Sequence, residues 1–160
     1  MKKLPQRKII RWQGYDYSGA GMYFITICTH LNTLGKYVVQ KWLETPAIRT
    51  DINITLDEFV VMTNHFHGIL VFGQNRFNIP AGGHIAGGGN KFGPQSKNLA
   101  AVIRGFKGSV TSYARDHQIP FGWQSRYHDH VIRNHVEYER IAQYIINNPL
   151  NWHDDVFHTP

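Results

Sequence analysis

The pattern of apolar and polar residues along the chain indicates strands in some segments and helices, with apolar residues three and four positions apart, in others. Runs rich in β-branched and aromatic residues predict strands at Met22–Thr29, Thr55–Met62 and His65–Phe72. Only two residues separate the last two runs, so we expect a β-hairpin there. A shorter extended segment is predicted within Trp123–Arg133.

Apolar residues at spacings of three and four predict three helices. The first covers Leu34–Thr45 and is predicted to end at Pro46. The second follows Ser96, a candidate N-cap, and the third covers about 135–148. The order strand, helix, hairpin, helix, strand, helix predicts one α+β domain across residues 1–160, with a single sheet layered by helices.

Two stretches depart from this pattern. Residues 1–20 are basic, aromatic and rich in turn formers, which indicates an amino-terminal arm. Residues 73–97 are rich in Gly, Asn and Pro and predict a flexible loop, because they offer too little apolar surface to bury. The triple glycine inside this loop lacks the GK[ST] ending of a phosphate-binding loop.

Composition and charge narrow the class of protein. The 160 residues are 42% apolar and 18% charged, as in an ordinary globular domain. The formal net charge of +6 is compatible with a polyanionic partner. A single cysteine, Cys28, permits no internal disulfide, which predicts a cytoplasmic protein. No apolar run is long enough to cross a bilayer, so no membrane association is expected.

Two histidines stand one residue apart inside the apolar run VVMTNHFHGILV. Alternate residues of a strand share a face, so His65 and His67 are predicted to point the same way. Two uses stay open: each imidazole hydrogen-bonds a backbone carbonyl, or the pair offers two lone pairs to a metal ion. A metal would need a third ligand from elsewhere. His128 and His130 form a rival pair with the same spacing in a more polar context.

The last predicted helix carries a conspicuous tyrosine. Its apolar stripe is expected to face the core and consists of Tyr138, Ile141, Ala142 and Ile145. Tyr144 and Asn148 lie one turn apart beside this stripe, so their side chains are predicted to emerge together. A half-buried ring with a solvated hydroxyl is an equally open interpretation of Tyr144. Tyr127, in a basic and aromatic segment, is a second candidate, whereas packing explains Tyr113.

Five segments in order resemble one protein family. They are GYDYSGAGMYFITICTH, LDEFVVMTNHFHGILV, GPQSKNLAAVIRGFKGSVTSYARD, WQSRYHDHVIRN and YIINNPLNW. Together they cover most of the chain outside the Gly-rich loop. On these segments the chain resembles the REP-associated tyrosine transposases, a branch of the single-tyrosine HUH transposases of bacterial insertion sequences.

The resemblance implies a fold, a site and an activity. The fold is a single ferredoxin-like antiparallel sheet packed with helices. Tyr144 of the Y-I-x-x-N-P motif is the implied nucleophile, and the implied metal ligands are His65, His67 and Asn148. The implied activity is metal-dependent cleavage and transfer of single-stranded DNA at hairpin or palindromic repeats, through a 5′-phosphotyrosine. The metal is Mg²⁺ or Mn²⁺, and imidazole ligands suit Mn²⁺ better. Whether the chain acts as a monomer or homodimer stays open.

The DNA contacts expected from this activity fall into two groups. Aromatic residues of the arm could stack on unpaired bases, namely Trp12, Tyr15 and Tyr17. Basic residues are candidates for contacts to the DNA backbone, namely Lys97, Arg104, Lys107, Arg115 and Arg126.

The chain departs from the family pattern at three places. Thr63 stands where relatives usually have Pro, and His128 replaces a usual aromatic residue. Near residues 30–36 the chain is shorter than relatives by about a hairpin, which could remove an edge strand and impair activity. A non-catalytic module that binds single-stranded nucleic acid is therefore the alternative function. A small-molecule hydrolase is disfavoured, because no further acidic or histidine ligands accompany the H-x-H pair.

Overall fold

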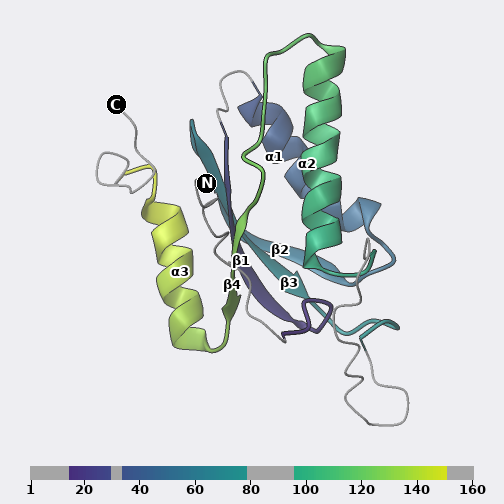
Figure 1. Ribbon diagram of the computed structural model, residues 1–160. Helices are drawn as coiled ribbons and strands as arrows, with labels where there is room; N and C mark the ends of the chain where they lie inside the picture. The colour runs from purple at the N-terminus through teal and green to yellow at the C-terminus, as the bar shows by residue number, and fades with distance from the viewer. Residues whose placement is uncertain (1–14, 30–33, 79–95, 151–160) are drawn as a thin grey trace, which may run out of the picture.

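A computed structural model describes residues 15–29, 34–78 and 96–150 of the protein (Figure 1). Trp12, with most of the predicted arm and most of the predicted Gly-rich loop, lies outside the described residues. The elements follow in the predicted order: β1 Gly21–Cys28, α1 Gly35–Ile48, β2 Ile54–Val61, β3 His65–Phe72, α2 Leu99–Asp116, β4 His128–Ile132 and α3 His135–Asn147. No helix in this described part of the chain combines the length and apolar character that a bilayer crossing requires.

The four strands form one antiparallel sheet in the order β2-β3-β1-β4. With α1 and α2 they make the βαββαβ arrangement of a ferredoxin-like fold, to which α3 is added. The α+β prediction is confirmed. All four strands of this arrangement are present, although few residues join β1 to α1. The short connection therefore leaves the four-stranded sheet intact.

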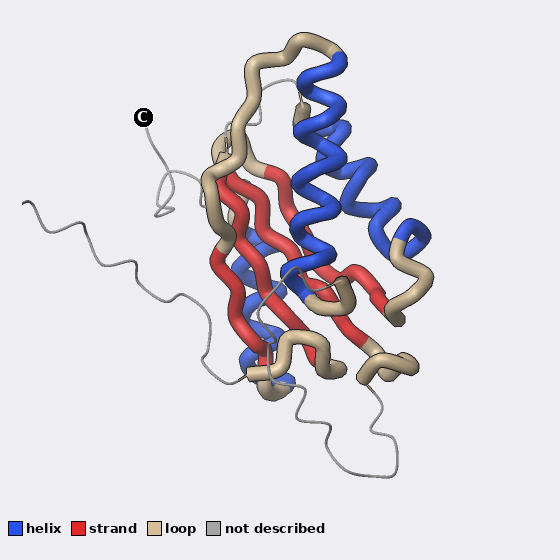
Figure 2. The backbone as a smooth tube through the Cα atoms, turned by 45° about the vertical axis from the view of Figure 1, so that its right-hand side comes forward, coloured by secondary structure: helices blue, strands red, loops and turns tan. Residues whose placement is uncertain are grey.

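The helices cover both faces of the sheet. Figures 1 and 2 show α1 and α2 side by side on one face and α3 on the other. The alternation of β3 matches these two layers: Phe66 and Leu70 belong to the larger core beneath α1 and α2, whereas Ile69 packs with Ile141 and Ile145 beneath α3. The apolar stripe predicted for the last helix is therefore confirmed.

Two helix boundaries differ from the sequence-based expectation. Pro46 was expected to end the first helix but lies inside α1, which continues to Ile48. A proline removes the hydrogen bond of its own nitrogen and its ring crowds the carbonyl four residues earlier. Both effects are confined here to the last turn, where the Arg49 backbone N–H still donates to the Thr45 carbonyl at 3.0 Å. The N-cap of α2 is Asn98, not Ser96: the Asn98 side chain accepts a hydrogen bond from the Ala101 backbone N–H at 3.1 Å.

Gly68 lets the sheet and α1 approach closely at the centre of the larger core. A Cβ atom at this position would lie 2.8 Å from Cζ2 of Trp42, a fully buried ring. Gly68→Ala should therefore lower the free energy of unfolding by about 1–3 kcal/mol, measured by urea denaturation. Gly108→Ala is the control, since a Cβ there meets nothing within 4 Å in α2. The free energy of unfolding of the Gly108→Ala protein should rise by about 0.5–1 kcal/mol, because alanine is favoured over glycine inside a helix. A Gly68→Ala protein as stable as the parent would contradict this account.

An ion-pair network joins the end of α1 to the segment before α2. Arg49 Nε lies 3.0 Å from Asp51 Oδ1, Lys97 also pairs with Asp51, and Arg49 donates to the Ser96 carbonyl at 2.6 Å. Hydrogen bonds from Arg49, and secondly from Lys97, lower the pKa of Asp51 well below its usual 3.8. The network therefore adds stability above that usual value and loses it as the pH falls toward the lowered pKa.

This linkage gives a pH prediction. Asp51→Asn should lower the urea midpoint near neutral pH and remove part of the decline in stability between about pH 5 and pH 2. Asp116→Asn, at the exposed end of α2, should leave that decline as it is. If the Asp51→Asn protein and the parent lose stability in parallel over this range, the network contributes nothing to acid sensitivity.

Candidate active site

The histidine pair lies at the start of β3, on the face of the sheet that α3 covers. His65 and His67 are buried, and their ring centroids are 4.4 Å apart. His67 pairs in register with Thr26 of β1 and Val60 of β2, because β3 is a central strand. The structure thus places the two imidazoles on one face, as the strand alternation predicts.

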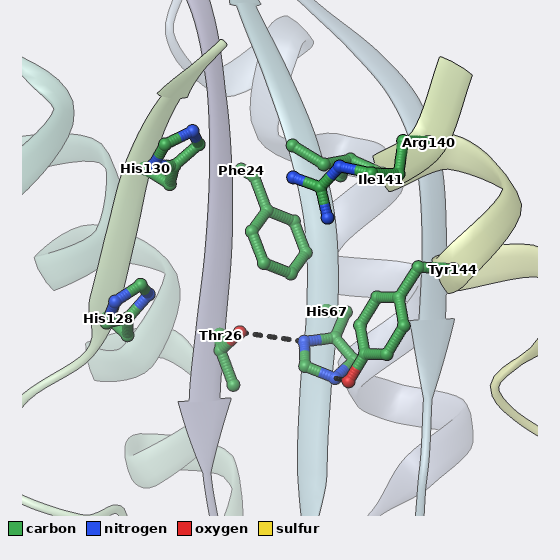
Figure 3. Close-up of a pocket in the computed structure, with 8 residues that line it drawn as sticks. All are labelled: Phe24, Thr26, His67, His128, His130, Arg140, Ile141 and Tyr144. Carbon is green, nitrogen blue, oxygen red and sulfur yellow. Dashed lines mark hydrogen bonds between the residues drawn. The ribbon is translucent and has the colours of Figure 1, made fainter. Parts of the chain in front are cut away.

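Hydrogen bonds orient both imidazole rings. Nδ1 of His65 lies 2.7 Å from Oδ1 of Asn64, and Nδ1 of His67 lies 2.8 Å from Oγ1 of Thr26 (Figure 3). An amide oxygen only accepts, so this contact favours the His65 tautomer with the proton on Nδ1 and the lone pair on Nε2. Oxygen partners at Nδ1 are the usual outer contacts of histidines that bind a metal through Nε2.

Tyr144 reaches this pair from α3. Its hydroxyl lies 3.2 Å from Nε2 of His67, and its ring packs edge-on against His67 and Phe24. Tyr144 stands beside the buried stripe of α3, so the ring meets the sheet while the side chain stays 40% exposed. The other candidate, Tyr127, packs against the larger core, which α1 and α2 cover on the opposite face.

Asn148 lies one turn beyond Tyr144, as its sequence spacing predicts. It caps the carboxyl end of α3 and is 2% exposed. Among the described residues no group of three or more His, Cys, Asp or Glu side chains could hold a metal. The two imidazoles on one face and the amide oxygen of Asn148 are side-chain donors of the kinds that divalent ions accept.

A pocket of about 350 Å³ opens beside Tyr144 (Figure 3). β1, β3, β4 and α3 all contribute to its lining, which consists of Phe24, Thr26, His67, His128, His130, Arg140, Ile141 and Tyr144. Thr26 pairs in register with His67 on one side and with His128 on the other, so one histidine of each H-x-H pair belongs to the same row across the sheet. Sequence reasoning set His128 and His130 aside as a rival pair, and it did not select Arg140.

Polar contacts fix the amino-terminal half of α3. Nε2 of His130 lies 2.7 Å from Oε1 of Glu137, which also accepts from the Arg133 backbone N–H at 2.9 Å through Oε2. The hydrogen bond from the Arg133 backbone N–H, and secondly the one with His130, lower the pKa of Glu137. Tyr138 donates to Asp57 of β2 at 3.2 Å, and this hydrogen bond raises the pKa of Tyr138. These contacts hold the helix that carries Tyr144 against both edges of the sheet.

Some of the residues predicted to contact DNA are buried or paired within the protein, and others are exposed. Tyr17 is 5% exposed and packs in the larger core with Tyr15 and Tyr23, so its ring is not presented for stacking on a base. Lys97 is paired with Asp51, and Lys107 donates to the Gln124 carbonyl at 2.8 Å. Of the basic residues predicted to contact DNA, Arg104, Arg115 and Arg126 are exposed. Arg104 and Arg115 lie on α2, on the face of the sheet away from Tyr144.

Comparison with known proteins finds a relative in sequence and a solved structure of similar fold. No family model matches the chain. An uncharacterized protein of Haemophilus influenzae is 36% identical over 171 aligned residues, covering 95% of this chain and 93% of the relative. The aligned length exceeds the 160 residues of this chain, so the relative has residues that this chain lacks.

The structure of a REP-associated tyrosine transposase bound to a REP hairpin superposes with a TM-score of 0.61. It is 19% identical and covers 89% of this chain and 73% of that chain, so the similarity is one of fold. A candidate transposase from Deinococcus radiodurans gives a TM-score of only 0.39 at 16% identity, over 86% of this chain and 95% of that chain. This chain therefore belongs to the same family as the Haemophilus influenzae protein and has the fold of a REP-associated tyrosine transposase.

Proposed function

We propose that the protein is a metal-dependent transposase or endonuclease of single-stranded DNA, with Tyr144 as its nucleophile. The observation that carries the proposal is the 3.2 Å contact between the Tyr144 hydroxyl and Nε2 of His67, two residues 77 positions apart in the sequence. The proposed chemistry requires the nucleophile to lie close to the metal ligands, and this contact brings the Tyr144 hydroxyl to one of them. The fold shared with a tyrosine transposase supports it.

The reaction has two balanced steps. In cleavage, the Tyr144 oxygen forms a bond to the scissile phosphorus while the bond to the 3′ oxygen breaks. Tyr144 loses its proton and the departing 3′ oxygen gains one, leaving a 5′-phosphotyrosine. In transfer, the 3′-hydroxyl of a second strand attacks that phosphorus, the bond between phosphorus and the Tyr144 oxygen breaks, and the proton of the hydroxyl passes to Tyr144. The number of phosphodiester bonds is conserved, so no outside energy source is needed.

We assign the divalent ion to His65, His67 and Asn148. When bound there it would supply Lewis-acid polarisation of the scissile phosphate and offset the charge of the transition state. Two imidazoles and one amide oxygen favour Mn²⁺ over Mg²⁺, which prefers oxygen ligands. The chain itself orients the rings through Thr26 and Asn64.

The proposed substrate is a single strand that carries a hairpin. The neighbour of similar fold was solved with a REP hairpin, and the net charge of +6 suits a polyanion. The test is to incubate the protein and Mn²⁺ with labelled hairpins whose single-stranded flanks are randomised, and to look for an adduct that survives denaturation. An adduct supports the proposal. Salt-sensitive binding without any adduct would overturn it in favour of the non-catalytic binding module.

A further inference from the structure

The pocket beside Tyr144 extends away from the proposed metal ligands. Its lining includes His67 but neither His65 nor Asn148, and it continues across Thr26 to His128 of β4. The proposed cleavage chemistry uses only Tyr144 and the metal ligands. Most of this pocket therefore has no role in that chemistry.

We propose that this pocket binds the nucleotide adjoining the scissile phosphate. The base lies against Phe24 and Ile141, and the phosphate of the same nucleotide faces Arg140 and His128. The proposal rests on the proposed function, since Tyr144 at the pocket wall defines which phosphate is scissile.

The size and floor of the pocket suit one nucleotide. A volume of about 350 Å³ lies at the lower end of the range for small-molecule sites, which is enough for a base with its sugar and not for two. Phe24 is partly exposed at the floor, with its ring stacked beside His67 at 5.3 Å between centroids. A flat aromatic floor holds bases of any sequence by stacking.

Arg140 supplies the positive charge. It extends from α3 toward Phe24 and, among the described residues, it makes no hydrogen bond or ion pair (Figure 3). By contrast, Lys97 and Lys107 are engaged within the protein. An arginine offers five N–H donors in a geometry that matches phosphate oxygens, so Arg140 is equipped for an external anion.

The histidines of β4 divide between two roles. His130 is held by Glu137, which ties that ring to α3. His128 is exposed, lies in the same row as Thr26 and His67, and has no hydrogen bond within the described part of the chain. His128 is therefore the one assigned to the phosphate. The Glu137 carboxylate is the nearby group that would repel an anion, and its contacts with His130 and the Arg133 N–H offset that charge.

The first experiment needs neither metal nor cleavage. Thymidine 3′,5′-bisphosphate, a nucleotide with a phosphate on each side, is titrated into the full chain while histidine ring signals are followed by NMR. We expect the His128 signal to shift and that of the distant His117 to stay. Arg140→Gln and Phe24→Leu should each weaken binding about tenfold. The control Arg76→Gln, which removes an equal charge outside the pocket, should change it less than about twofold. Equal effects of Arg140→Gln and Arg76→Gln would overturn the proposal.

The second experiment separates this inference from the proposed function. Once the adduct is mapped, the nucleotides on either side of the cleaved bond are replaced in turn by abasic sites. One of the two replacements should lower the rate of adduct formation by the parent protein about tenfold. The same replacement should have less effect on the Phe24→Leu protein, which has already lost the stacking surface. Adduct formation that is insensitive to both abasic sites would overturn the nucleotide subsite and leave the nuclease in place. Bisphosphate binding that depends on Arg140, without any adduct, would keep the subsite and overturn the nuclease.

Discussion

Replacing Tyr144 with phenylalanine should abolish the covalent protein–DNA adduct, lowering its rate of formation at least about a thousandfold, the scale on which removal of a nucleophile acts. The substitution removes only the hydroxyl that lies 3.2 Å from His67. The ring keeps its edge-on packing against Phe24 and His67, so the fold should be retained. The measurement is the rate of adduct formation on the hairpin substrate in Mn²⁺, with DNA affinity and thermal unfolding recorded on the same protein.

Tyr127→Phe is the matched control. Tyr127 packs on the opposite face of the sheet, so its hydroxyl should be dispensable for the adduct. DNA affinity should be similar in both variants, because neither loses a charge. An undiminished adduct in Tyr144→Phe, with loss in Tyr127→Phe, would move the nucleophile to the segment before β4 and refute the site described above.

The second large effect concerns the metal. His67→Ala should eliminate Mn²⁺ binding, measured by the electron paramagnetic resonance signal of free Mn²⁺, and should eliminate cleavage with it. The reason is that His67 is a proposed ligand and also the contact of Tyr144. Thr26→Val should weaken Mn²⁺ binding by about 10-fold to 100-fold, since it removes the hydroxyl that orients Nδ1 of His67.

His117→Ala is the control for that series, because His117 lies at the far end of α2 and stacks on Tyr113. It should bind Mn²⁺ like the parent. Excess chelator should stop cleavage by the parent, and added Mn²⁺ should restore it. Unchanged Mn²⁺ affinity in His67→Ala would place the ion elsewhere in the protein.

Local periodicity accounts for what was predicted well. The two-residue repeat of a strand put His65 and His67 on one face, and the helical repeat put Tyr144 and Asn148 on one side of α3. These relations depend only on backbone geometry within one element, so a single sequence contains them. The same holds for the order of the elements and for the two apolar faces of β3.

Long-range packing decided what sequence reasoning missed. The sequence marks Tyr17 as an aromatic residue of a basic arm, yet contact with Tyr15 and Tyr23 buries it in the core. The sequence alone suggests that Lys97 is available for DNA, but in the structure it forms an ion pair with Asp51, which follows the end of α1. Burial and pairing of this kind depend on which segments meet, and no periodicity within one segment specifies that.

For this protein, the sequence by itself determined the elements and the side of each element on which the histidines and the tyrosine stand. Only the tertiary structure decided that β1 lies between β3 and β4, so that Thr26 joins His67 and His128 in one row. It also decided that α3 crosses this row and brings Tyr144 to His67 with Arg140 beside it. The reason is physical: dihedral preferences act between neighbours in the chain, whereas strand partners, register and the seating of a helix are set by burying apolar surface among residues far apart in sequence.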